Sequence, residues 1–156
     1  MITPAPTTRI DPTLARGVVA RQLPATATRP AFLVVSFPNT SYELHLELLA
    51  GAAGEAAARA VEGSRIVGVI NAEANRIDVV TSGGRYVEPV SGRPRRVQGM
   101  VVGVSGDLVV VDAGMAIHCK PMDARQKAAD FQAGDFVSFD VRRGATWGEQ
   151  AQGTGH

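Results

Sequence analysis

The chain has 156 residues, of which 45% are hydrophobic and 20% are charged, which is typical of a globular protein with one ordinary domain or two very small ones. Its 16 Lys+Arg against 15 Asp+Glu leave a formal net charge of +1, so the overall balance does not indicate a polyanionic partner. The single cysteine, Cys119, excludes an internal disulfide framework and a metal cluster held by several cysteines.

The apolar runs of the sequence are too short to cross a membrane. The longest, such as Ala31–Val35 and Leu108–Val111, fall far below the roughly 20 residues that a membrane helix requires. The N-terminus also lacks the apolar segment of a secretory signal. We therefore expect a cytoplasmic protein with no membrane partner.

The first half of the chain alternates short runs of β-forming residues with turn signals such as Pro38-Asn39. The clearest strand is Tyr42–Leu48, in which apolar and polar residues alternate strictly. The alanine-rich segment Ala50–Val61 is predicted to be helical, with Gly63 just past its end. The strands expected in this half are Val18–Leu23, Phe32–Phe37, Tyr42–Leu48, Arg65–Ile70, Arg76–Thr81 and Arg85–Val90.

The second half predicts a meander of strands, then a helix and a last strand. Strong turn sequences at 105–107 and 112–114 separate the strands of the meander. Asp123 as an N-cap, with Gln126 completing a capping box, predicts a helix over Asp123–Gln132 that Gly134 stops. The strands expected in this half are Val97–Val104, Leu108–Val111, Met115–Lys120 and Phe136–Val141.

Two internal similarities indicate a repeated architecture. At a period of 31 residues Arg65 aligns with Arg96, and neighbouring glycine and apolar positions also match, which predicts one strand–turn–strand–turn unit that occurs twice. Over a longer range, residues 33–66 and residues 108–137 share an order of strand, turn, histidine-containing strand, helix and returning strand.

This longer similarity resembles the order of elements in the oligonucleotide-binding (OB) fold, a small Greek-key barrel. The resemblance covers residues 17–81 and 96–147 and implies a mainly β protein of two tandem small OB-like β-barrels, each with one short helix, and flexible N- and C-terminal tails. The second copy has no evident fifth strand after Val141, which leaves open an incomplete barrel, a strand donated by another segment, or a different small β-barrel. The expected division is a tail (1–16), a first barrel (17–90), a Pro/Arg linker (91–96), a second barrel (97–147) and a tail (148–156).

Three further segments, Tyr86–Val90, Gly92–Gly99 and Gly134–Val141, resemble short uncharacterised bacterial proteins of planctomycete type. That resemblance implies a bacterial protein, and it transfers neither an activity nor site residues.

Arginine accounts for 14 of the 16 basic residues, leaving only Lys120 and Lys127. The guanidinium group suits bidentate binding to phosphate, although GC-rich codon usage also produces such a bias. Several arginines gather at the expected junction of the barrels, where a rigid phosphate-facing patch and a solvated linker are the two alternatives. The candidate nucleic-acid-binding residues are Arg85, Arg93, Arg95 and Arg96, extended by Arg142 and Arg143.

Other polar residues favour structural roles. Glu43, His45 and Glu47 lie on one strand face at intervals of about 7 Å, too far apart to converge on one metal ion. Cys119 and its neighbour His118 point to opposite faces, so they cannot act as a nucleophile and its base. No phosphate-binding loop, dinucleotide fingerprint or zinc-protease motif occurs. We therefore expect no catalytic site, no metal site and no cofactor, and hence no enzyme.

Two functions remain open. The first is a non-catalytic module that binds RNA or single-stranded DNA through arginine contacts to the backbone, although only eight aromatic residues are available for stacking. The second is a structural or adaptor protein that assembles with copies of itself, as a homo-oligomer, or with another protein through exposed barrel edges. An incomplete second barrel would favour the second function.

Overall fold

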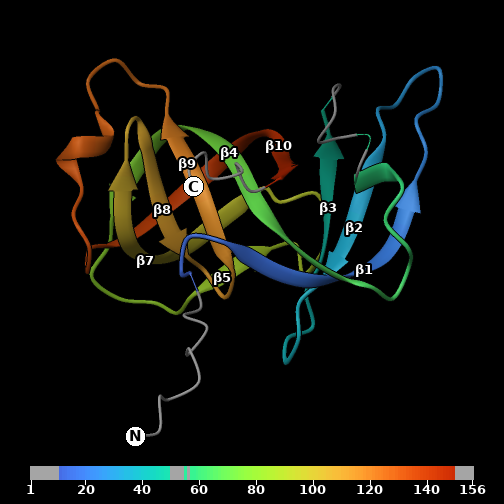
Figure 1. Cartoon of the computed structure of the whole chain (residues 1–156). Coiled ribbons are helices and arrows are strands. Elements are labelled where there is room, and N and C mark those ends of the chain that lie inside the picture. Colours follow the sequence, from blue (N-terminus) through green and yellow to red (C-terminus); the bar gives the residue numbers. More distant parts are fainter. Residues whose placement is uncertain (1–10, 50–54, 56, 150–156) are drawn as a thin grey trace, which may run out of the picture.

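The computed structural model describes residues 11–49, 55 and 57–149, which form strands joined by turns, a short 3-10 helix and helical residues at 55, 57 and 58 (Figure 1). The mainly β class is therefore confirmed. The elements are β1 (Ala15–Leu23), β2 (Phe32–Ser36), β3 (Glu43–Leu48), β4 (Arg65–Val79), β5 (Tyr86–Glu88), β6 (Ser91–Gly92), β7 (Arg96–Ser105), β8 (Leu108–Asp112), β9 (Ala116–Pro121), η1 (Ala128–Asp130) and β10 (Phe136–Glu149).

The hydrogen-bonded strands form two closed rings. In the first ring, β1, β2, β3, β10 and β4 follow one another, and β4 returns to β1; all neighbours are antiparallel except β3 and β10, which are parallel. In the second ring, β7, β8, β9, β4 and β10 follow one another, and β10 returns to β7; here only β9 and β4 are parallel. The two rings thus repeat one pattern of strand directions.

Strands β4 and β10 belong to both rings and cross the middle of the molecule (Figure 1). The start of β4 pairs with β1 as far as Gly68, and its middle, Asn71–Ala74, pairs with β9. The start of β10, Phe136–Asp140, pairs with β7, and Thr146 and Trp147 pair with β3. Each ring therefore closes with a strand that continues from the other half.

One hydrophobic core extends through both halves. Residues at alternate positions of the strands, among them Leu44, Ile70, Val111 and Trp147, are fully or almost fully buried and belong to a single cluster. Because burying large aliphatic and aromatic side chains is the main stabilising contribution to folding, the two rings stabilise each other.

The two shared strands are longer than the sequence pattern predicts. The segments Arg65–Ile70 and Arg76–Thr81 were expected as separate strands, but β4 is continuous from Arg65 to Val79. Its middle contains the small buried residues Ala72 and Ala74, and neighbouring strands pair along both edges there. This pairing outweighs the weak β-propensity of the segment.

The limits of the first and last strands also differ from the prediction. Strand β10 does not stop at Val141 but reaches Glu149, and β1 begins at Ala15 rather than at Val18, so both strands enter the expected tails. Of the expected tails, residues 1–10 and 150–156 lie outside the described part of the chain.

The predicted helix Asp123–Gln132 is wrong. Only η1 is helical there: Asp123 makes a cap-type hydrogen bond, but the Gln126 side chain bonds to β4 and does not complete the capping box. The Asp123 carboxylate accepts a hydrogen bond from the Arg125 backbone, and the Gln126 amide bonds both the N–H and the C=O of Ile77 on β4. For the other predicted helix, Ala50–Val61, residues 50–54 and 56 lie outside the described part, and Glu55, Ala57 and Ala58 are helical.

The two sequence similarities have opposite outcomes. The 31-residue repeat is wrong as a structural unit, because residues 65–79 form one strand whereas residues 96–112 form the hairpin of β7 and β8. The longer similarity is confirmed in its order of strands, since β2, β3 and β4 have the same relations to their neighbours as β8, β9 and β10. Among residues 11–49, 55 and 57–149, no helix is long and apolar enough to cross a membrane.

Candidate functional site

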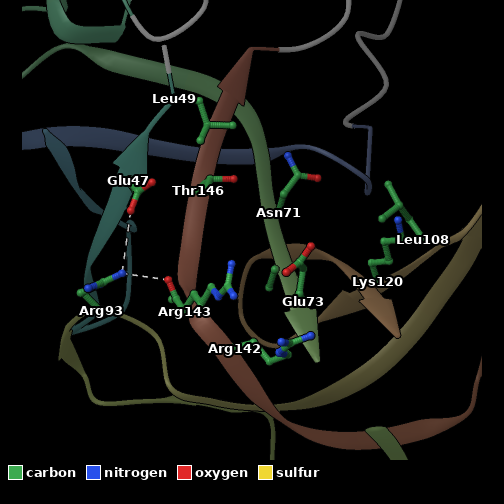
Figure 2. Close-up of a pocket in the computed structure, with 12 residues that line it drawn as sticks. Glu47, Leu49, Asn71, Glu73, Arg93, Leu108, Lys120, Arg142, Arg143 and Thr146 are labelled. Atoms are coloured by element: carbon green, nitrogen blue, oxygen red, sulfur yellow. Dashed lines mark hydrogen bonds and ion pairs between the residues drawn. The ribbon is translucent and has the colours of Figure 1, made fainter. Parts of the chain in front are cut away.

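A cleft of about 470 Å³ opens where the antiparallel pairing of the two shared strands, β4 and β10, is interrupted (Figure 2). Its walls come from the ends of β3 and β9, the middle of β4, the second half of β10 and the segment before β7. The lining residues are Glu47, Leu49, Asn71, Ala72, Glu73, Arg93, Leu108, Lys120, Arg142, Arg143, Gly144 and Thr146.

A bulge in β10 shapes one wall of this cleft. Arg142 is paired with Glu73, but the next paired residue is Thr146, which faces Asn71, so β10 has extra residues between these pairs. Arg143 and Gly144 take left-handed conformations, with φ of 59° and 73°. A bulge turns side chains away from their regular strand directions, and here it presents Arg143 at the cleft.

Arg93 is held in place at the edge of the cleft. Its guanidinium donates a hydrogen bond of 2.8 Å to the carbonyl of Arg143 and lies 3.9 Å from the Glu47 carboxylate (Figure 2). It also lies over the Phe32 ring, 5.0 Å from the ring centre. Arg93 therefore fixes the bulge of β10 to the end of β3.

The two halves of the chain contribute different charges to the cleft. Glu47 and Glu73 come from the first half, whereas Lys120, Arg142 and Arg143 come from the second. Lys120 also forms an ion pair of 3.4 Å with Asp107, and within the described ranges no ion pair links Arg142, Arg143 or Glu73 to another side chain. With four basic and two acidic side chains, the cleft has a positive net charge in a molecule close to neutral.

Only some of the arginines singled out from the sequence line this cleft. The structure brings Arg93 together with Arg142 and Arg143, although they are distant in sequence. Arg95 is exposed beside this group, and its backbone bonds to Glu88 and Val141.

Arg85 and Arg96 lie outside the cleft and make other contacts. Arg85 forms an ion pair of 3.1 Å with Asp112. Arg96 donates to Asp140 at 2.8 Å and to Ser138 at 3.0 Å, and hydrogen bonds with Tyr86 and Asp140 raise the pKa of Arg96.

Four polar residues of the cleft were not expected from the sequence: Asn71, Glu73, Lys120 and Thr146. The sequence pattern places Asn71 and Glu73 in a break between two strands, and the parallel pairing of β4 with β9 leaves no local signature. For Lys120, the sequence offers one signal of a special position: it is one of only two lysines in an arginine-rich chain.

The polar trio of β3 has separate partners. Glu43 forms an ion pair of 3.5 Å with Arg21, and Glu47 faces Arg93. Desolvation, followed by the positive charge of Arg21, lowers the pKa of His45. No group of three potential metal ligands occurs in the part of the chain that the structure describes.

Cys119 is fully buried, as its position in the strand pattern predicts. Burial, with a smaller contribution from the charge of Glu73, raises the pKa of the Cys119 thiol well above its usual range. A thiol that stays protonated is a poor nucleophile, so this residue acts as a small apolar side chain of the core.

The chemistry of the cleft suits an anionic ligand that approaches from solvent. Guanidinium and ammonium groups on three neighbouring segments can donate to several oxygens at once. Comparison with models of protein families, with curated proteins and with solved structures finds no match for this chain.

Proposed function

We propose that the protein is a non-catalytic module that binds RNA or single-stranded DNA through arginine contacts to the phosphate backbone. The observation that carries this proposal is the cleft beside the bulge of β10, where Arg142 and Arg143 have no ion-pair partner among the described residues. Cations that are not already paired can neutralise phosphates and release their counterions, which drives binding.

Neighbouring cations extend this surface. Lys120 lies across the cleft, and its exposed ion pair with Asp107 is weak in water, so it remains available to a phosphate. Arg95, exposed next to Arg93, extends the surface toward β7. Arg85 and Arg96, which face Asp112 and Asp140, contribute less.

The arrangement of the strands supports the interpretation of each ring as an OB-like barrel. Three antiparallel strands are followed by a short helical segment, a fourth strand returns to the first, and the strand in the fifth position is parallel to the third. The two tandem barrels of this proposal exchange strands, because the fourth strand of each continues as the fifth strand of the other. Likeness of fold is supporting analogy, and the cleft is the physical argument.

The second candidate is an adaptor that assembles through free barrel edges. It was motivated by a missing fifth strand after Val141, but β4 occupies that position beside β9. In the described part of the chain, the edge that remains beside β7 belongs to β5, which has three residues. Such a short edge gives little surface for strand addition, so the adaptor has weaker support.

Binding of fluorescently labelled single-stranded 12-mers of deoxythymidine and of uridine tests the proposal. Wild type should bind at low salt, and the double variant R142A/R143A should bind more weakly. Its slope of log K against log[salt] should be shallower by about 1.4, because two phosphate contacts are lost. The control R59A/R65A removes the same charge from exposed positions outside the cleft and should behave as wild type.

Absence of binding at low salt, or an equal loss in R142A/R143A and in R59A/R65A, would overturn the proposal. Light scattering at two concentrations separates the second candidate, which requires a mass that rises with protein concentration or a stable complex with a partner.

A further inference from the structure

A carboxylate lies among the cations of the cleft. Glu73 is half-buried on β4, and its register partners on the two adjacent strands are Lys120 on β9 and Arg142 on β10. Figure 2 shows its carboxylate directed into the cleft between these strands. A negative charge there weakens binding of phosphate alone, so a ligand that fits the whole cleft must carry hydrogen-bond donors as well as oxygens.

Among the nucleobases, guanine presents both kinds of group next to each other. Its N1–H and N2 amino group form a pair of donors, which matches the two acceptor oxygens of a carboxylate. Its O6 and N7 are acceptors that a guanidinium group can bind in bidentate fashion. Thymine and uracil have only one N–H on this edge, and it lies between two carbonyl oxygens. A carboxylate repels these oxygens because both groups are negatively polarised.

We propose that the cleft selects a guanine in single-stranded nucleic acid. The Glu73 carboxylate accepts hydrogen bonds from N1–H and the N2 amino group, and the Arg142 guanidinium donates to O6 and N7. This inference rests on the proposed function, and it assigns the choice of base to Glu73 on β4 and Arg142 on β10, and the backbone contacts to Arg143 and Lys120.

The spacing of the strands fits this assignment. Neighbouring strands lie about 4.8 Å apart, so side chains in register on β4 and β10 can reach adjacent groups of one planar base. The cleft also contains Leu49, which is 52% exposed, and the half-buried Leu108. These apolar side chains offer surfaces for the faces of the base, in place of the aromatic rings that this chain lacks there.

The test compares labelled deoxythymidine 12-mers that differ at one central position. The central nucleotide carries thymine, guanine, hypoxanthine (the base of inosine) or 7-deazaguanine. Hypoxanthine lacks the N2 amino group of guanine, and 7-deazaguanine lacks N7. Wild type should bind the guanine oligomer about tenfold more tightly than the inosine oligomer, and 7-deazaguanine should also weaken binding. A single guanine avoids structures that guanine-rich strands form with themselves.

The variants E73Q and D78N separate the role of Glu73 from general loss of negative charge. Asp78 lies on the same strand, and its partner is Arg76 outside the cleft. E73Q should bind guanine and inosine oligomers equally while it retains binding to the thymine oligomer, and D78N should keep the wild-type ratio.

Each outcome decides between the proposals. Equal binding of guanine and inosine by wild type overturns the guanine inference and leaves the proposed function standing, and this comparison needs no variant to fold. A preference for guanine that persists in folded E73Q overturns the role of Glu73. Failure of wild type to bind any of these oligomers overturns both the inference and the function on which it rests.

Discussion

The two rings share one strand pattern, but they are closed to different extents. In the first ring, the parallel contact of β3 with β10 has two register pairs, Glu47 with Thr146 and Leu48 with Trp147. In the second ring, the parallel contact of β9 with β4 has four pairs, and the side chain of Gln126 bonds β4 further along. The comparison indicates that closure of the first ring depends on packing of the large Trp147 side chain, whereas closure of the second ring depends on hydrogen bonding along β4.

Replacing Trp147 should have the largest effect. Trp147 is 2% exposed, and W147A should lower the free energy of unfolding by about 3–5 kcal/mol because it leaves a large cavity. Urea denaturation measures the loss. Hydrogen exchange should accelerate more in β1 and β3 than in β7 and β8, because Trp147 belongs to the part of β10 that closes the first ring.

The conservative variant W147F serves as the control, since it keeps an aromatic ring in the core and should retain most of the stability. Equal acceleration of exchange in both rings of W147A would contradict the difference in closure.

Removing the Gln126 side chain should have an intermediate effect on the second ring. Its amide bonds both backbone groups of Ile77, with Oε1 accepting from N at 2.9 Å and Nε2 donating to O at 2.6 Å. Q126A leaves these groups without their partners, which should lower the free energy of unfolding by about 1–3 kcal/mol. The exposed Gln132 provides a matched control, Q132A, whose denaturation midpoint should stay near that of wild type. A midpoint unchanged in Q126A would show that water replaces the amide.

Replacing Arg143 in the bulge of β10 by a residue that tolerates a left-handed conformation should give the smallest effect on stability. Arg143 has a φ of 59°, a conformation that asparagine adopts more readily than arginine. R143N should therefore raise the free energy of unfolding by about 0.5 kcal/mol, and under the proposed function it should weaken oligonucleotide binding. Thermal denaturation and anisotropy measured on the same preparations check both effects. R143K, which keeps the charge and the unfavourable conformation, should show no gain in stability.

Local patterns predicted the individual strands better than their partners. Alternation in Tyr42–Leu48 and the turns around residues 105–107 and 112–114 correspond to β3 and to the meander of β7, β8 and β9. These signals are local, because they depend on side-chain direction and turn chemistry. The strand break expected after Ile70 is wrong because pairing with distant strands keeps this segment extended: Ala72 and Ala74 pair with β9, and Ala74 also pairs with β10.

The candidate site was predictable only in part for the same reason. Arg93, Arg142 and Arg143 carry the right chemistry in the sequence, but their proximity depends on the bulge of β10 and on the path of the chain before β7. Glu73 and Lys120 meet across a parallel pairing, for which the sequence between β4 and β9 contains no turn signal. Charge runs in the sequence therefore favoured Arg85 and Arg96, whose partners in the structure are Asp112 and Asp140.

The exchange of strands between the rings has a consequence for how the chain folds. Thr146 pairs with Glu47, which lies 99 positions earlier, so the first ring cannot close during synthesis until nearly all of the described chain has left the ribosome. Contacts between distant residues carry a high entropy cost before they stabilise anything, and they slow folding. We therefore expect a slow, cooperative folding reaction in which both rings form together, and nascent chains that end before β10 should expose the edges of β3 and β4 to chaperones or to other chains.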